Sequence, residues 1–119
     1  MPRVKASSES DIWIYEVPYE RFDNGTYKEI EVELLKKIVD KGPYIVMDLK
    51  NVKYMSSVGV RTIMTATNSA RKKGGDMVLC NLQDHVSEVF VLSGLKDIIH
   101  KEVGVPSAKK ALVQGYDIS

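Results

Sequence analysis

Two adjacent serines, Ser56 and Ser57, are the side chains in this sequence whose type and setting best suit chemistry. They stand between a short apolar run and a segment with helical periodicity, and Gly59 follows two residues later. A serine hydroxyl at this place can act as an N-cap, because it accepts a hydrogen bond from the unpaired N–H groups of the first helical turn. The same N–H groups and the helix dipole favour an anion, so a phosphate on a serine there would be stabilised.

The catalytic and metal-binding alternatives lack the residues that they need. A serine nucleophile needs an activating base, and the sequence contains no G-x-S-x-G motif. The two histidines, His85 and His100, are isolated from each other and from the single cysteine, Cys80, so they form no metal-ligand spacing. Gly74-Gly75 joins a helix to a strand, whereas a phosphate-binding loop joins a strand to a helix. The sequence therefore predicts no catalytic residue, no metal site and no cofactor.

The elements that position the serines are a strand before them and a helix after them. Residues 44–47 form an apolar run between Gly42-Pro43 and Asp48, which is typical of a strand buried on both faces. In the following helix, which ends near Gly74-Gly75, one face carries Val60, Ile63, Met64 and Thr67.

Upstream of this strand the pattern predicts a strand and a helix. Residues 11–17 are aromatic and β-branched, and residues 19–22 resume the strand before the turn residues Asp23, Asn24 and Gly25. Thr26 and Glu29 have the spacing of a capping box. The helix that follows runs to about Lys41, and its inner face consists of Tyr27, Ile30, Leu34 and Ile38.

Downstream, strands and helices continue to alternate. Residues 77–82 predict a buried strand, Asp84 can cap a helix that stops at Gly94, residues 95–99 predict a short last strand, and Pro106 opens a helix to about Val113. Such alternation favours βαβ units with right-handed crossovers and a mainly parallel sheet.

Composition indicates one folded domain without a charged partner. The chain has 119 residues, 44% hydrophobic and 28% charged residues, and a formal net charge of +1, which gives no indication of nucleic acid or of an anionic membrane surface. One cysteine and the lack of a long apolar run or signal peptide predict a soluble cytoplasmic protein. Residues 1–10 are expected to be a flexible N-terminus or a short first strand at residues 4–6, and residues 11–115 the domain.

Three separated motifs resemble the anti-anti-sigma factors, which are small single-domain members of the STAS family. Residues 48–60, DLKNVKYMSSVGV, are similar to the family signature around its phosphorylated serine. Residues 73–82 are similar to the next strand of the family, and residues 90–95, FVLSGL, to the end of its third helix. The resemblance covers residues 11–112. It implies a single STAS-like α/β domain with a mixed, mainly parallel sheet of four to five strands and about four helices largely on one side.

The resemblance also implies a partner switch. In the family, the serine that corresponds to Ser57 is phosphorylated by an anti-sigma factor that is itself a serine kinase. The unmodified protein would bind that anti-sigma factor and free a sigma factor, and a phosphatase would reset the switch. ATP and magnesium would belong to the partner kinase. The expected partner-binding residues are Asp23, Asn24, Ser56, Ser57, Val58, Gly59 and Arg61, and the free protein is expected to be a monomer.

The sequence departs from the family at three positions in this loop. Ser56 stands where aspartate is usual, Val58 where serine or threonine is usual, and Arg61 where a second glycine is usual. Ser56 is therefore an alternative acceptor, and Arg61 could approach a phosphate on Ser57. A STAS scaffold protein with altered or absent phosphorylation, and a small-ligand or nucleotide-binding module, remain alternatives. A bulky residue at Gly59 is expected to impair partner docking more than folding.

Overall fold

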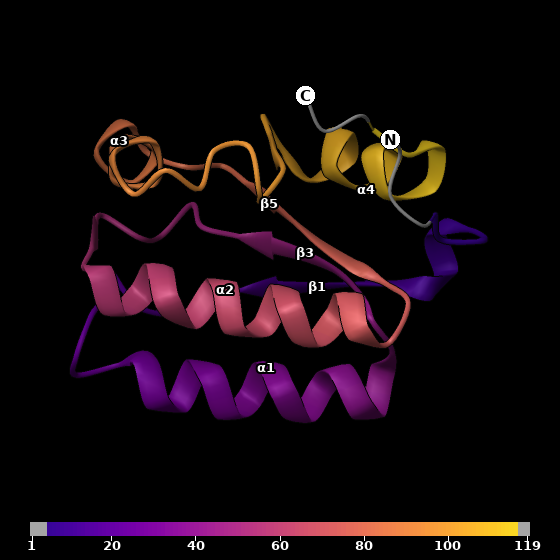
Figure 1. Cartoon of the computed structure of the whole chain (residues 1–119), viewed down its shortest axis with the longest axis horizontal. Helices are drawn as coiled ribbons and strands as arrows, with labels where there is room; N and C mark the ends of the chain where they lie inside the picture. The colour runs from indigo at the N-terminus through magenta and orange to yellow at the C-terminus, as the bar shows by residue number, and fades with distance from the viewer. Residues whose placement is uncertain (1–4, 117–119) are drawn as a thin grey trace.

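A four-stranded parallel sheet runs through the middle of the protein (Figure 1). Its strands are β1 (Ile12–Glu16), β3 (Tyr44–Asp48), β5 (Asp76–Cys80) and β6 (Lys101–Glu102), and they lie in the order β1-β3-β5-β6. The computed structural model describes residues 5–116 of the chain. Because β3 and β5 have neighbours on both sides and are covered on both faces, nearly all of their residues are buried. The expected α/β domain with a mainly parallel sheet is confirmed, and every strand pair within residues 5–116 is parallel.

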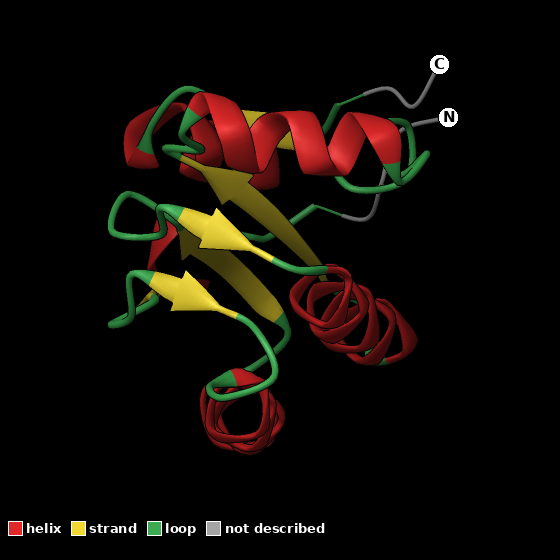
Figure 2. Ribbon diagram, turned by 90° about the vertical axis from the view of Figure 1, so that its left-hand side faces the viewer, coloured by secondary structure: helices red, strands yellow, loops and turns green. Residues whose placement is uncertain are grey.

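Within residues 5–116, four helices pack around the strands (Figure 2). Helices α1 (Tyr27–Lys41) and α2 (Ser57–Lys72) lie side by side on one face, and α4 (Val105–Gln114) covers the opposite face through β3, β5 and β6. Helix α3 (Asp84–Leu92) contacts β4 and α2, and its buried residues join the core under α1 and α2. A three-residue 3-10 turn, Glu9–Asp11, precedes β1.

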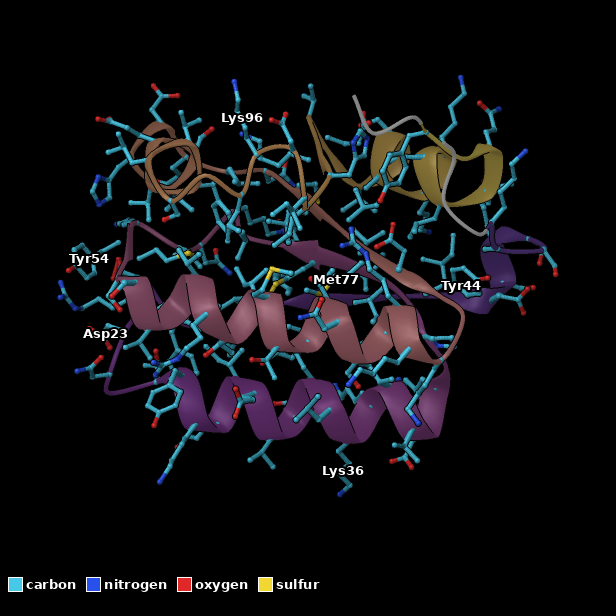
Figure 3. All side chains as sticks on the ribbon, in the orientation of Figure 1. Asp23, Lys36, Tyr44, Tyr54, Met77 and Lys96 are labelled. Carbon is cyan, nitrogen blue, oxygen red and sulfur yellow. The ribbon has the colours of Figure 1, made fainter. Side chains whose placement is uncertain are left out.

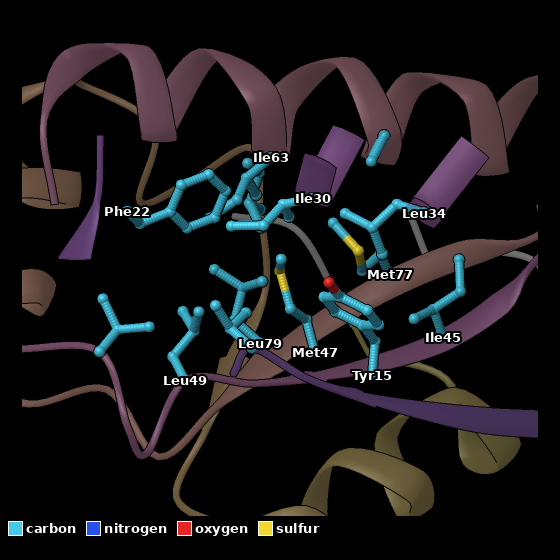
Figure 4. Close-up of a cluster of buried hydrophobic side chains, with 14 of the residues drawn as sticks. Tyr15, Phe22, Ile30, Leu34, Ile45, Met47, Leu49, Ile63, Met77 and Leu79 are labelled. Atoms are coloured by element: carbon cyan, nitrogen blue, oxygen red, sulfur yellow. The ribbon is translucent and has the colours of Figure 1, made fainter. Parts of the chain in front are cut away.

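The larger core lies between the sheet and helices α1 and α2 (Figure 4). The buried positions predicted for the inner face of α1, Ile30, Leu34 and Ile38, are confirmed. On α2 the same holds for Val60, Ile63 and Thr67, whereas Met64 is half-buried. From the strands, the side chains that meet these helices are Tyr15, Ile45, Met47, Met77 and Leu79. Each full burial of a large apolar side chain stabilises the fold by about 1.5–3 kcal/mol, so this contact dominates the stability of the protein.

A smaller core lies on the other face of the sheet, under α4. Val46, Val78 and Cys80 point to this face and pack against Ala108 and Leu112. Cys80 is fully buried and has no disulfide partner. Burial raises the pKa of its thiol to about 11, with a further contribution from the nearby carboxylate of Asp48. The thiol therefore stays protonated and unreactive near neutral pH.

Two expectations for the second half of the chain are corrected. Residues 95–99 form turns and no strand, because the carbonyl of Leu95 accepts the N–H groups of Ile98 and Ile99, both at 3.0 Å. The last strand is β6, two residues further on, and Ile99 is a buried anchor before it. Asp84 is the first residue of α3, and the N-cap of that helix is Gln83.

The capping box expected at the start of α1 is also wrong. Thr26 is the N-cap, but its side chain makes no capping hydrogen bond. Its hydroxyl instead accepts the N–H of Asp23 at 3.1 Å and donates to the carbonyl of Arg21 at 2.9 Å, while Glu29 accepts the hydroxyl of Tyr19. Contacts with the preceding turn have replaced the local cap. The short strand considered at residues 4–6 begins at Val4, which lies outside the described residues; Lys5 and Ala6 are in no strand.

A second, two-stranded sheet supports the start of α2. Strand β2 (Arg21–Phe22) pairs in parallel with β4 (Tyr54–Met55), and Phe22 and Met55 are opposite each other and buried. Gly59 of α2 lies directly on this pair: a Cβ at Gly59 would be 2.8 Å from the carbonyl oxygen of Phe22 and 2.9 Å from Cγ of Met55. Gly59 therefore has a packing role, and the expectation that a larger residue there would affect docking more than folding stays a prediction.

We predict that Gly59→Ala destabilises the protein by about 1–3 kcal/mol, because the backbone carbonyl of Phe22 cannot move away cheaply. Helix propensity alone predicts the opposite, a gain of about 1 kcal/mol for alanine over glycine. Urea unfolding of both proteins distinguishes the two effects. Gly25→Ala is the matched control, because its added Cβ would meet Oδ1 of Asp23 at 3.4 Å, an ordinary contact. A Gly59→Ala protein as stable as the wild type would contradict the close packing.

Candidate functional site at the start of helix α2

The two serines lie at the junction between β4 and α2. Ser56 is the N-cap of the helix, with extended backbone angles, and Ser57 is its first residue. The N–H of Ser56 donates to the carbonyl of Phe22 at 3.0 Å, which continues the pairing of β4 with β2 by one bond. Strand pairing thus fixes where the helix begins, and with it the position of both hydroxyls.

The two hydroxyls have different surroundings. Ser57 is exposed, whereas Oγ of Ser56 is buried and hydrogen-bonds no atom of residues 5–116. Ser56 occupies the N-cap position that the sequence predicts, but its side chain makes no capping bond. The first N–H groups of an α-helix have no partners within the helix, so this end of α2 keeps its attraction for an anion.

The turn with Asp23 and Asn24 lies at the same edge as the serines. Asp23 directly follows Phe22, and the parallel register of β2 with β4 brings the carboxyl ends of both strands together. Figure 3 shows Asp23 and Tyr54 at the end of the molecule where α2 begins. The carboxylate of Asp23 accepts Nε of Arg21 and the N–H of Gly25, both at 2.9 Å, and these contacts hold the pKa of Asp23 below its usual range.

The remaining predicted residues are on the first turns of α2. Val58 is half-buried, and Gly59 is buried on the side of α2 that packs against the β2–β4 pair. Arg61 is exposed, lies four residues after Ser57 on the same helical face, and forms no ion pair within the described part of the chain. The structure therefore gathers the predicted residues at one end of the protein, with Gly59 in a supporting position.

Sequence reasoning missed a stack of three side chains beside this site. The guanidinium of Arg21 lies 4.2 Å from the ring centroid of Tyr54, and the ring of His85 stacks on Tyr54 at 5.7 Å. Tyr54 stays 37% exposed. Arg21 and Tyr54 are opposite each other in the β2–β4 pair, so the contact depends on a register between two strands of two residues each. Strands this short give no periodicity from which the pairing could be predicted.

Polar contacts hold the loop between β3 and β4 in place. The buried carboxylate of Asp48 accepts the N–H of Lys50 at 3.0 Å and Nδ2 of Asn81 at 3.1 Å. Nε2 of Gln83 donates to the carbonyl of Lys50 at 3.0 Å, and Nδ2 of Asn51 donates to Glu16 at 3.0 Å. The loop that leads to the serine junction is therefore held by contacts with β1 and with the segment that follows β5.

The site lacks the parts of a hydrolytic or metal centre. No side chain among residues 5–116 hydrogen-bonds the hydroxyl of Ser57; His85 stacks on Tyr54, and His100 pairs with Glu102. A group of three potential metal ligands is absent from the described residues. In the same residues, none of the helices has the length and hydropathy to cross a membrane. An exposed, unactivated hydroxyl next to helical N–H groups and an arginine suits phosphate acceptance and protein contact.

Comparisons with known proteins identify the family of the chain. The STAS domain family matches residues 4–108. BtrV of Bordetella bronchiseptica, which is classed with anti-sigma factor antagonists, is 37% identical over 90 residues, which are 71% of this chain and 77% of that protein. The anti-sigma-B factor antagonist of Bacillus subtilis is 34% identical over 67 residues, 56% of this chain and 62% of that protein.

Solved structures share the fold. The anti-sigma factor antagonist SpoIIAA in its unphosphorylated form superposes with a TM-score of 0.71 at 15% identity, over 93% of this chain and 94% of that chain. The phosphorylated form of SpoIIAA, a cell fate determinant of Bacillus, superposes with a TM-score of 0.65 at 14% identity, over 93% and 99% of the two chains. The motifs, the fold and the relatives agree, and this chain belongs to the STAS domain family, among the anti-sigma factor antagonists.

Proposed function

We propose that this protein binds an anti-sigma factor with serine kinase activity, and that this binding releases a sigma factor in the cytoplasm. Phosphorylation of Ser57 ends the binding, and a serine phosphatase restores it. The observation that carries the proposal is the exposed hydroxyl of Ser57 at the first residue of α2, beside the turn that contains Asp23 and Asn24. ATP and magnesium are bound by the partner kinase, and the free protein is a monomer.

Exposure favours Ser57 over Ser56 as the acceptor. A kinase must place the acceptor oxygen in line with the γ-phosphate, so the hydroxyl has to be reachable. Oγ of Ser56 is buried, whereas Ser57 is exposed. A phosphate on Ser56 would require the atoms packed around this buried hydroxyl, at the junction between β4 and α2, to move apart.

The charge of a phosphate is sufficient to end the binding. It adds about 1.5–2 negative charges at pH 7. Burying this group against a surface that fits a neutral hydroxyl is costly unless cations pair with it. A loss of only about 2.7 kcal/mol weakens binding roughly a hundredfold. Arg61 lies one turn after Ser57 and can offset part of this charge within the protein itself.

The departures at Ser56, Val58 and Arg61 favour a second candidate function. A kinase that recognises an aspartate before its acceptor would find the neutral Ser56 here. In this alternative the protein uses the same surface to bind a different signalling partner as a scaffold, and Ser57 is rarely or never phosphorylated. A stable complex formed without any kinase would support it.

One experiment distinguishes the two functions. The purified protein is incubated with candidate anti-sigma kinases from its own source and ATP, complex formation is measured, and any phosphate is mapped by mass spectrometry. Phosphate on Ser57 with loss of the complex supports the switch. A stable complex without phosphate supports the proposed binding to the anti-sigma factor and contradicts the proposed regulation by phosphorylation. Neither phosphate nor complex with any such kinase favours the scaffold.

We predict that Ser57→Ala keeps the fold and the partner complex but abolishes phosphorylation, because only the exposed hydroxyl is removed. Ser57→Asp should weaken the complex about tenfold or more, which corresponds to about 1.4 kcal/mol. Titration calorimetry and phosphate mapping measure the two effects. Ser93→Ala, which removes an exposed serine at the end of α3, is the control. If the Ser57→Ala protein is still phosphorylated stoichiometrically, another residue is the acceptor and the assignment to Ser57 is wrong.

We also predict that Ser56→Ala changes the free energy of unfolding by less than about 0.5 kcal/mol, whereas loss of a true N-cap serine costs about 0.5–2 kcal/mol. The reason is that Oγ of Ser56 makes no hydrogen bond within residues 5–116. Urea unfolding tests the stability, and the same kinase assay should still show phosphate on Ser57. A loss above 1 kcal/mol, on the scale of a real cap, would show that the hydroxyl does cap the helix in solution.

A further inference from the structure

An open cavity of about 380 Å³ lies at the carboxyl ends of β5 and β6, beside the first turn of α3 and before α4. It does not include the serine junction. The carboxyl ends of parallel strands are where α/β proteins commonly bind small molecules. The residues that line the cavity are Asn81, Leu82, Ser87, Lys101, Glu102 and Val103.

A lysine supplies the positive charge of this cavity. Nζ of half-buried Lys101 donates to Oγ of Ser87 at 3.1 Å. No carboxylate pairs with Lys101 anywhere in residues 5–116. A partly desolvated ammonium group without a counter-charge attracts an anion. Because the hydroxyl of Ser87 accepts from Lys101, its own proton is free to be donated to the same anion.

The cavity lining also includes aliphatic side chains. Leu82 is half-buried, and Val103 is 88% exposed although it is a large aliphatic side chain. One N–H of the Asn81 amide is bound to the buried carboxylate of Asp48, which fixes the amide at the edge of the cavity. The lining of the cavity therefore combines a cationic side chain with two aliphatic side chains.

The carboxylate of Glu102 limits the charge that the cavity accepts. Oε2 of Glu102 is hydrogen-bonded to His100, and the residue lines the same space as Lys101. A dianion such as hydrogen phosphate would be repelled by Glu102 more strongly than a singly charged carboxylate. We propose that this cavity binds a small monocarboxylate, whose carboxylate contacts Lys101 and Ser87 and whose aliphatic chain packs on Leu82 and Val103.

The loop beside this cavity is tied to the loop that leads to the serines. Asn81 donates to Asp48, and Gln83 donates to the carbonyl of Lys50. A carboxylate bound in the cavity would therefore lie beside residues 81–83, which are hydrogen-bonded to the loop that leads to the serines. Binding in the cavity does not require phosphorylation or any partner, so it is tested on the purified protein alone.

Titration of the isotopically labelled full chain with hexanoate, followed by amide NMR shifts, tests the proposal. We expect saturable shifts at residues 81–87 and 101–104. Lys101→Met should weaken binding about tenfold, the effect of losing one charge-assisted contact. Lys36→Met, on the outer side of α1 (Figure 3), is the matched control and should bind like the wild type. Glu102→Gln should bind hexanoate more tightly, since it removes the repelling charge.

Three outcomes would overturn the site. The first is the absence of saturable shifts in the wild type. The second is a Lys101→Met protein that binds hexanoate with unchanged affinity. The third is a set of shifts spread over residues far from the cavity. Inorganic phosphate, titrated in parallel, should bind more weakly than hexanoate, and equal or tighter binding would refute the monocarboxylate assignment. If Lys101→Met does not fold, as judged by circular dichroism, Ser87→Ala replaces it, and unchanged hexanoate binding by that variant would equally refute the site.

Discussion

The carbonyl of Phe22 is the contact on which the candidate site depends. It accepts the N–H of Ser56 at the end of β4, and Gly59 packs against it from one turn into α2. A side chain at position 59 would meet a backbone atom, which cannot take another rotamer, so only glycine allows the helix to lie this close. This carbonyl thereby fixes the relative positions of three segments: the turn with Asp23, the serine junction and the first turn of α2.

This rigidity makes a charge-based switch physically reasonable. The serine junction is held on one side by the β2–β4 pair and on the other by the contacts of Asp48 with Lys50 and Asn81. A phosphate on an exposed hydroxyl at such a place needs no change of fold to act, because the cost of burying its charge at a protein interface is enough. Arg61 is the residue of this chain that can moderate that cost.

The same polar contacts bring a second region near the serine loop. Asn81 has a backbone φ of 57°, a conformation that asparagine tolerates better than most residues, and in that conformation its amide reaches Asp48. Beyond Asn81 lies the cavity with Lys101 and Ser87, on the same edge of the sheet. The serine loop and the small cavity are thus joined by hydrogen bonds between the segments beside them.

The sequence by itself determined the elements that have long periodic patterns. The inner face of α1, the buried strands β3 and β5 and the place of Ser56 and Ser57 at the start of a helix all followed from apolar spacing and breaker residues. Only the tertiary structure decided the contacts between distant residues. It replaced the cap at Thr26 by bonds to the preceding turn, moved the last strand from residues 95–99 to β6, and placed Gly59 against the carbonyl of Phe22. It also distinguished the exposed Ser57 from the buried Ser56. The physical reason is that periodicity reports which face of an element is buried, whereas the atom that lies against that face belongs to another part of the chain.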